Sequence, residues 1–290
     1  MPNPIIGQSI PRKEGRDKVT GRAQYIDDLV LPEMLYGATV RSNVARGRIR
    51  QINFAEYIPW HEFTIVTAAD IPGANVVALI LDDQPYLADG EVNHPEEPIL
   101  LLAHPDKYLL EAARRAITFD IEPLPAIFTM DESLDQTEIV WGKDNVFKTY
   151  LMNKGNVDAV WRQLDLADLI VEGEYETGAQ EQLYIENNGM LAVANADEGV
   201  TVWGSMQCPY YIHKALLKLF SNLSPEKIRV IQTVTGGGFG GKEEYPSVIA
   251  GHAALLAWKS GQPVKLVYDR AEDMAATTKR HPSRTRHRTA

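Results

Sequence analysis

The stretch Gly236-Gly237-Gly238-Phe239-Gly240-Gly241-Lys242-Glu243 decides how the rest of the sequence is interpreted. Five of its first six residues are glycine, which lets a backbone turn sharply and bring its amides close to a ligand. The β-branched run 228–234 predicts a strand before it, and the alanine-rich run 248–258 predicts a helix after it. The loop therefore joins a strand end to a helix start, where unpaired N–H groups and the helix dipole favour an anion.

Two interpretations of this loop rest on its residues alone. Gly236, Gly241 and Lys242 have the spacing of a phosphate-binding P-loop, and the apolar strand predicted at 264–269 ends in an aspartate, as in P-loop enzymes. The next residue, however, is Glu243, where the P-loop has a Ser or Thr that holds magnesium. The other interpretation is a tight glycine turn that serves packing alone.

A second turn, Gln207-Cys208-Pro209, precedes the loop and adds a third interpretation. The two turns together resemble the molybdenum-binding subunit of the xanthine dehydrogenase and aldehyde oxidase family of molybdenum hydroxylases. The resemblance implies that the backbone of Phe239 and Gly240 lies against an oxygen ligand of molybdenum, and that Gln207 hydrogen-bonds a metal-bound oxygen. It also implies that Glu243 faces the substrate, as in the xanthine-oxidising members, which accounts for a Glu in place of Ser or Thr.

Other segments carry the same resemblance over nearly all of the chain. KVTGRAQYIDDL at 18–29 resembles the opening of the subunit, and EPLPA at 122–126 resembles the close of its hammerhead domain. Residues 270–274 and 279–282 resemble its "DRxEDM…RHP" continuation. The resemblance thus extends well beyond the glycine loop.

Residues 180–186 are similar to the family's Gln-x-His-x-x-x-Glu segment, with Gln182 in place of the histidine. Glutamine keeps hydrogen-bonding capacity and lacks an ionisable ring, so no proton transfer is assigned to it. We interpret Glu186 as a buried, paired structural carboxylate and Lys242 as a residue that supports the loop or pairs with a carboxylate. We interpret Cys208, which has no sequence-local His or cation, as a small buried hydrophobe.

The predicted fold class is α+β, a hammerhead-type α/β domain followed by the first part of a molybdopterin-binding α+β domain. Alternating apolar runs predict several short strands, and a 3.6-residue period predicts a helix over 107–118. The strands in this half are predicted at 37–41, 49–52, 63–67, 76–81, 99–103 and 119–122. We place an entry segment and hammerhead-like domain at 1–135, a connector at 136–154, and the N-terminal part of a molybdopterin-binding domain at 155–290.

In the second half, the patterns predict a strand at 168–177, a hairpin of 191–194 with 200–203, and a helix over 209–220. Gln207 therefore lies at a strand-to-helix turn, as the glycine loop does. Two such turns in one sheet are expected to converge at the strand ends, where open sheets bind ligands.

Composition restricts the class of protein. With 44% apolar and 23% charged residues the chain is typical of globular proteins, and its net charge of −10 argues against nucleic-acid binding. The single cysteine excludes a four-thiolate iron–sulfur cluster built from these residues alone. No apolar run approaches the ~18 residues of a membrane span, so we predict a cytoplasmic protein with no membrane partner.

The resemblance implies a molybdenum enzyme that hydroxylates a purine, an N-heterocycle or an aldehyde with oxygen from water. The cofactor is then molybdopterin, and FAD and [2Fe-2S] clusters are expected on partner chains: an FAD-binding subunit and a [2Fe-2S] subunit. Gln207 and Glu243 are the candidate catalytic residues. Gln207, Phe239 and Gly240 are the candidate cofactor contacts.

In the family, further segments supply an arginine at the substrate, more pterin contacts and a glutamate general base, and the resemblance gives them no counterpart in these residues. We therefore expect a fragment, a split subunit completed by the remainder of the molybdopterin-binding subunit, or a degenerate relative. We expect the chain alone neither to hydroxylate substrate nor to hold the pterin tightly. A P-loop nucleotide binder and a non-catalytic assembly module are the alternatives.

Overall fold

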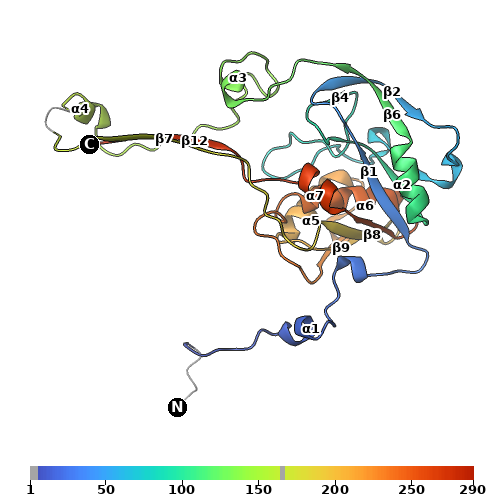
Figure 1. Cartoon of the computed structure of the whole chain (residues 1–290). Helices are drawn as coiled ribbons and strands as arrows, with labels where there is room; N and C mark the ends of the chain where they lie inside the picture. Colours follow the sequence, from blue (N-terminus) through green and yellow to red (C-terminus); the bar gives the residue numbers. More distant parts are fainter. Residues whose placement is uncertain (1–5, 164–166) are drawn as a thin grey trace.

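A computed structural model describes residues 6–163 and 167–290. Its body is built on one seven-stranded sheet with the spatial order β10-β9-β8-β11-β1-β5-β3 (Figure 1). These strands are β10 (Ile228–Gln232), β9 (Gly199–Gly204), β8 (Gly189–Asn195), β11 (Val264–Val267), β1 (Leu35–Arg41), β5 (Pro98–His104) and β3 (Thr64–Val66). Each of them overlaps a strand predicted from the sequence.

Strands from both halves of the sequence share this sheet. β1 pairs parallel with β11 and antiparallel with β5, so the sheet continues without a break between the early and the late strands. β5 is buried along its whole length, as its apolar run predicts for a central strand. The apolar core is also shared, because Leu35, Val66 and Leu101 pack in one cluster with residues of α6 (Pro246–Ser260).

Helix α6 covers one face of the sheet and lies at the centre of this core. Residues 246–257 are all buried, and the sequence there is apolar or small on every side, which is typical of a helix enclosed by protein. It packs against β8 and β11 of the sheet and against α5 (Pro209–Leu219). α6 ends at Gly261, whose φ of 70° places it in the left-handed conformation common after a helix.

The second sheet is three-stranded, with β2 (Gly47–Phe54) between β4 (Glu91–Val92) and β6 (Ile117–Pro123). Helix α2 (Lys107–Arg115) lies between this sheet and the large one, with Leu110 and Ala113 buried. Asp106 caps α2 by accepting from two backbone amides. The prediction that this helix reaches Thr118 is wrong, because the β-branched Ile117 and Thr118 begin β6.

The strand predicted at 76–81 is also wrong. That segment is irregular, although Val77 and Ala78 are fully buried as an apolar run requires. The side chain of Asn75 satisfies backbone groups of the segment that follows. Its Oδ1 accepts hydrogen bonds from the amides of Tyr86 and Leu87 at 3.0 and 3.2 Å. A side chain that satisfies backbone groups competes with strand pairing.

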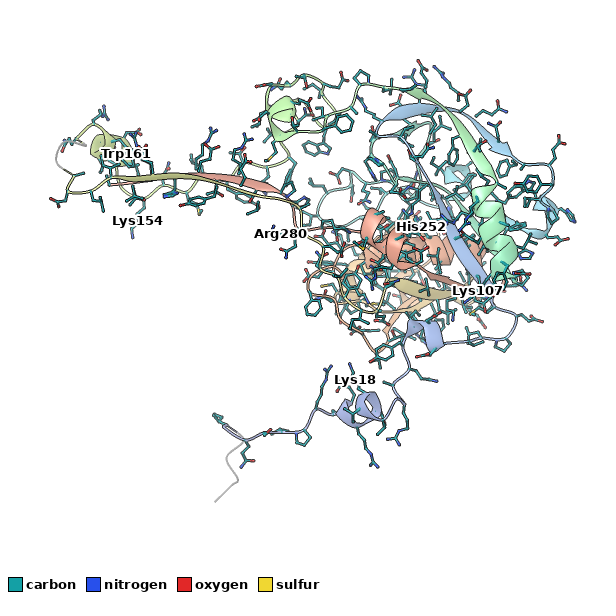
Figure 2. The ribbon with its side chains drawn as sticks, in the orientation of Figure 1. Lys18, Lys107, Lys154, Trp161, His252 and Arg280 are labelled. Carbon is teal, nitrogen blue, oxygen red and sulfur yellow. The ribbon has the colours of Figure 1, made fainter. Side chains whose placement is uncertain are left out.

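Two further parts extend from the body. A ribbon of β7 (Val171–Thr177) and β12 (Ser283–Thr289) projects far from it and carries α4 (Val157–Trp161) at its far end (Figure 1). In Figure 2, Trp161 and Lys154 mark that end, whereas Lys18 belongs to α1 (Gly15–Val19) in the entry segment. The other α-helices of the described residues are α3 (Met130–Leu134) and α7 (Arg270–Ala276), beside short 3-10 helices at Ile26–Asp28, Trp60–Glu62, Ala68–Asp70 and Pro225–Lys227.

Opposite charges face each other along the ribbon, since Arg284, Arg286 and Arg288 lie directly across from Glu176, Glu174 and Glu172. Among the described residues, no helix has both the length and the apolar character needed to cross a bilayer.

Replacing Gly251 by Ala is expected to destabilise the protein, against the usual effect in a helix. Alanine in a helix interior normally gains about 1 kcal/mol over glycine. Here the added methyl group would overlap ring carbons of the fully buried Tyr86. Overpacking of this kind costs roughly 1–3 kcal/mol. Urea unfolding of Gly251→Ala measures the sign, and in a Tyr86→Leu background the same substitution is expected to be stabilising.

We expect His252, labelled in Figure 2 within the body, to make the stability of the fold sensitive to acid. It is fully buried, its Nε2 donates to the Tyr86 carbonyl at 2.9 Å, and burial lowers its pKa to about 3. In the unfolded chain, the His252 imidazole takes up a proton below the ordinary histidine pKa of ~6.5, whereas in the folded chain it does not. The free energy of unfolding therefore falls as pH falls. We expect a loss of about 1 kcal/mol between pH 6.5 and 5.5. Urea unfolding of wild type and His252→Gln checks this, because the variant should lack this part of the slope.

Candidate functional site

The glycine loop and the Gln207 turn follow the ends of two neighbouring parallel strands. β9 and β10 pair in parallel, and their last residues, Gly204 and Gln232, lie opposite each other. The chain leaves β9 into the Gln207 turn and α5, and leaves β10 into the glycine loop and α6. The prediction that the two turns converge at the strand ends is confirmed.

Gln207 joins the two turns directly. Its Oε1 accepts hydrogen bonds from the amides of Gly240 at 3.0 Å and Lys242 at 3.2 Å, and its own amide donates to the Lys242 carbonyl at 2.7 Å. Two donors at the oxygen fix the orientation of the carboxamide, so the Nε2 is the group left to donate. The side chain is exposed, so this NH₂ faces the surface of the site.

The loop needs its glycines for two different reasons. Gly240 has a φ of 93°, a conformation that side chains rarely adopt, and Gly237 has a φ of 102°. At Gly238 the reason is close approach, because a Cβ there would overlap the Gln207 carboxamide. A Cβ at Gly236 or Gly241 would come within 2.5 Å of Glu186 or Tyr184 in the same way.

Phe239 stands at the apex of the loop. It is 78% exposed and has a φ of 50°, which is uncommon for a residue with a side chain and accompanies functional sites. Within the described part of the chain, the N–H groups of Gly238 and Phe239 donate no hydrogen bond. The apex therefore presents unpaired N–H donors next to the Gln207 carboxamide, an arrangement that suits an anionic ligand.

Behind the loop, one carboxylate oxygen holds both of its ends. Glu186 Oε2 accepts from the Gly236 amide at 2.6 Å, from Lys242 Nζ at 3.0 Å and from Ser205 Oγ at 2.5 Å. Lys242 is completely buried, its Nζ also lies 2.9 Å from Ser205 Oγ and 4.7 Å from the Tyr184 ring centre, and burial lowers its pKa. The interpretations of Glu186 as a paired carboxylate and of Lys242 as a residue that pairs with a carboxylate are confirmed, and the structure shows that each is the other's partner.

A polar network around Tyr184 supports this pair from below. The buried Tyr184 hydroxyl donates to Asp273 Oδ1 at 2.7 Å and accepts from Asn188 Nδ2 at 2.6 Å. Burial and the hydrogen bond to Asp273 raise the Tyr184 pKa, so the phenol stays protonated. Arg270 donates to the Tyr184 carbonyl at 2.7 Å. α7 thereby holds Tyr184, whose ring packs against Gly241 and Lys242 of the loop.

The remaining candidates lie at the rim and rear of the loop. Glu243 is exposed where the loop ends. Cys208 is half-buried, and burial followed by the charges of Glu243 and Glu244 raises its pKa, which disfavours a thiolate. Gln182 lies behind the loop against Gly241, and its buried Oε1 has no hydrogen-bond partner in the described residues.

The P-loop interpretation is not supported. A P-loop lysine must reach phosphates in front of the loop, but Lys242 Nζ points behind it, to Glu186 and Ser205. Its side chain has no exposed surface, and its charge is already paired with Glu186.

The donors of this site fit a molybdenum cofactor. Backbone N–H groups at Gly238 and Phe239 and the NH₂ of Gln207 suit the anionic ligands that such a cofactor carries, and the backbone approaches closely because Gly240 has no side chain. The described residues contain no group of three or more His, Cys, Asp or Glu that could hold a metal ion.

Two family models match the chain. The model of the molybdopterin cofactor-binding domain matches residues 141–290, and that of the aldehyde oxidase and xanthine dehydrogenase a/b hammerhead domain matches residues 20–125. The predicted fold class, a hammerhead domain followed by part of a molybdopterin-binding domain, is confirmed.

Solved structures agree on the fold. The aldehyde oxidoreductase of Desulfovibrio desulfuricans superposes with a TM-score of 0.87 at 24% identity over 98% of this chain and 33% of its own. A Cu,Mo-CO dehydrogenase superposes with a TM-score of 0.79 at 25% identity over 95% of this chain and 37% of its own.

Curated relatives share about a third of the residues. The large molybdopterin subunit of nicotinate dehydrogenase from Eubacterium barkeri is 32% identical over 96% of this chain and 64% of its own length. A probable xanthine dehydrogenase subunit of Bacillus subtilis is 32% identical over 93% of this chain and 36% of its own length. The chain thus spans less than two thirds of these relatives. It belongs to the molybdopterin cofactor-binding family of xanthine dehydrogenases and aldehyde oxidases.

Proposed function

We propose that this chain supplies one wall of the molybdenum cofactor site in a hydroxylase. The observation that carries this is the double hydrogen bond from Gly240 and Lys242 to Gln207 Oε1, which makes one donor surface of two separate turns. When bound, the cofactor supplies the two-electron oxidation that places a water-derived oxygen on a carbon beside nitrogen or oxygen.

The chain's own residues have distinct roles in this proposal. Gln207 Nε2 and the N–H of Phe239 would donate hydrogen bonds to oxygen ligands of the cofactor, against which the backbone at Gly240 would lie, a preorganised electrostatic role. Glu243, exposed at the rim, orients or protonates the substrate. Phe239, with its exposed ring, borders the space in front of these donors.

The substrate class we propose is an N-heterocycle or purine, with an aldehyde as the weaker candidate. A rim carboxylate such as Glu243 pairs with ring nitrogens and has no counterpart on a simple aldehyde. The E. barkeri relative is named for nicotinate and the B. subtilis relative for xanthine, which are both N-heterocycles.

We further propose that the complete site needs residues outside this chain and that electrons leave through other subunits. The relatives extend well beyond the matched region, and the single cysteine provides no four-thiolate cluster. A [2Fe-2S] subunit, an FAD-binding subunit and the remainder of the molybdopterin-binding subunit are the partners we infer.

An affinity tag on the chain tests the proposal by isolating its native assembly. We expect about stoichiometric molybdenum by mass spectrometry, a pterin by fluorescence after oxidation, and ¹⁸O from labelled water in hydroxylated nicotinate or hypoxanthine. Iron–sulfur and flavin without molybdenum would instead identify an assembly module. An assembly that lacks all three groups contradicts the proposal.

Replacing Glu243 by Gln is expected to separate the substrate classes. The amide keeps the size of the side chain and loses its charge and proton transfer, an effect on the order of 10²-fold or more for a group that acts on a heterocycle. We expect kcat/KM for the heterocycle to fall by about that factor while benzaldehyde oxidation stays within a few-fold. Glu244→Gln is the matched control, and equal losses on both substrates would contradict the assignment of Glu243 to the heterocycle.

A further inference from the structure

A pocket of about 380 Å³ lies where β1 and β11 separate. The two strands are parallel but pair only at their starts, Leu35 with Val264 and Tyr36 with Lys265. Beyond that point Gly37, Ala38, Leu266 and Val267 line the gap. Crevices between diverging parallel strands are common ligand sites in open sheets.

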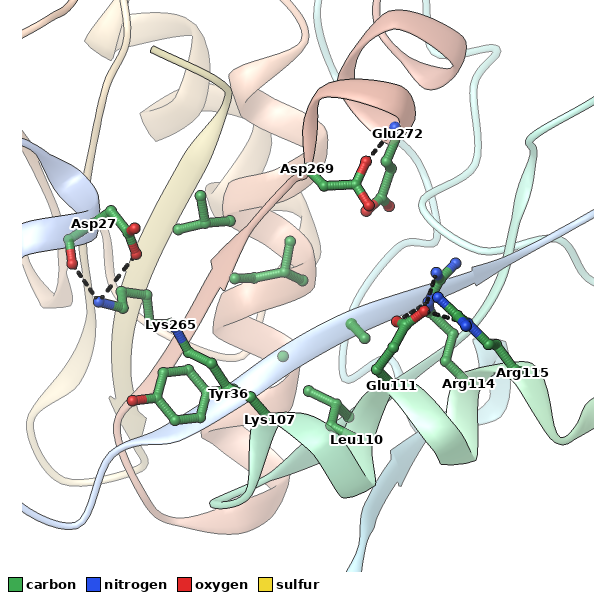
Figure 3. A pocket seen from close by; sticks show the side chains of 14 residues that line it. Asp27, Tyr36, Lys107, Leu110, Glu111, Arg114, Arg115, Lys265, Asp269 and Glu272 are labelled. Atoms are coloured by element: carbon green, nitrogen blue, oxygen red, sulfur yellow. Dashed lines mark hydrogen bonds and ion pairs between the residues drawn. The ribbon is translucent and has the colours of Figure 1, made fainter.

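The pocket is separate from the candidate cofactor site. None of its lining residues belongs to the Gln207 turn or to the glycine loop. One wall is α2, with Lys107, Glu111 and two arginines, and the opposite wall is the start of α7, with Asp269 and Glu272 (Figure 3).

Most charges that line the pocket have partners within the protein. Lys265 lies 3.5 Å from an Asp27 oxygen, and Glu272 lies 2.9 Å from Arg41. Arg114 and Arg115 share the Glu111 carboxylate at 2.8 and 2.6 Å. Two arginines on one carboxylate leave the α2 wall with an excess of positive charge.

Of the charges that line the pocket, Lys107 and Asp269 have no ion-pair partner among the described residues. They have opposite signs and lie on opposite walls. Lys107 Nζ lies over the Tyr36 ring, 4.4 Å from its centre, with no carboxylate within 4 Å. Among the described residues, the Asp269 carboxylate accepts only from the Glu272 amide, at 2.8 Å. The pKa of Arg114 is raised first by Glu111 and then by Glu272 and Asp269, so the acidic wall faces α2 across the gap.

We propose that this pocket binds a small zwitterion, with its anionic group at Lys107 and its ammonium group at Asp269. A dianion would meet the carboxylates of α7, and a dication would meet the lysine and arginines of α2. A molecule with both charges pairs with each wall and lies over the apolar floor of Ala38, Leu266 and Val267.

Calorimetric titration of the full chain with ligands matched in length tests the proposal. The probes are 4-aminobutyrate and 6-aminohexanoate, each compared with the diacid and the diamine of the same carbon number. We expect at least one ω-amino acid to bind about tenfold more tightly than its diacid and diamine, a difference of about 1.4 kcal/mol. The affinity should fall with salt.

Two variants check the assigned groups. Lys107→Met keeps the apolar stem over Tyr36, and Asp269→Asn keeps an N-cap for α7, so both preserve the fold. Each should weaken the ω-amino acid about tenfold, while Lys143→Met in the connector should not. Equal binding of a diacid, unchanged affinity in both variants, or no binding by any ω-amino acid overturns the proposal. None of these results depends on molybdenum.

Discussion

Lys242→Met should lower the free energy of unfolding by roughly 3–5 kcal/mol, the cost of leaving a buried charge without its partner. Lys242 has no exposed surface, and Glu186, which is 13% exposed, would keep its charge with only Ser205 and the Gly236 amide as donors. Because Glu186 holds both ends of the glycine loop, we also expect faster hydrogen exchange at 236–242. Urea unfolding and amide exchange by mass spectrometry measure the two effects.

Three variants make this expectation specific. Glu186→Gln should cost a similar amount, since it leaves a buried ammonium without an anion. The double variant Glu186→Gln, Lys242→Met should be more stable than the sum of the single losses indicates. Lys259→Met removes an exposed ion pair with Asp70, 2.6 Å long, and should cost at most about 1 kcal/mol. A Lys242 loss no larger than that of Lys259 would contradict the buried pair as the anchor of the loop.

Gln207→Ala and Gln207→Glu should both reduce turnover by the molybdenum-loaded assembly about 10²–10³-fold. Only Gln207→Ala should also loosen the loop. Glutamate keeps an oxygen that accepts from Gly240 and Lys242 but has no NH₂ to donate. Alanine removes both functions. Loss of one preorganised donor to developing negative charge commonly has an effect of this size.

The two roles of Gln207 are separated by measuring turnover and exchange together. We expect fast exchange of the Gly240 and Lys242 amides in Gln207→Ala and near-native protection in Gln207→Glu. Gln232→Glu is the matched control, because Gln232 Nε2 also donates nearby, to the Met206 carbonyl at 2.6 Å, but does not contact the loop apex. Wild-type turnover by Gln207→Glu would contradict a donor role for this side chain.

Local signals account for the parts of the site that the sequence predicts. The glycine run and the Gln-Cys-Pro segment each predict a turn. The strand and helix patterns around them place both turns between a strand end and a helix start. The convergence then follows from one further fact, the parallel pairing of β9 with β10. The two strands are close in sequence, since α5 and the short 3-10 helix at Pro225–Lys227 are the elements between them.

Beyond Glu186 and Lys242, the residues that support the loop from behind could not be found in this way. Ser205, Tyr184 and Asp273 are ordinary residues in their own segments, and their contacts join positions far apart in the sequence. The pairing of β1 with β11 has the same character, because nothing in either strand specifies a partner more than 200 residues away. The strand prediction at 76–81 failed for another reason: Val77 and Ala78 are buried as an apolar run requires, but the segment does not pair in a sheet.

The continuous seven-stranded sheet also bears on how a gene for such a chain can be divided. A break between residues 125 and 141 separates the two regions that the family models recognise, yet it leaves β1 on one product and β11 on the other. Each product would then expose a sheet edge and part of a shared apolar interior, both of which promote aggregation. Recombination that exchanges either region alone is expected to give a folded protein only when the new region can pair β1 with β11 and fill the shared core. The two regions are therefore expected to be inherited as one unit.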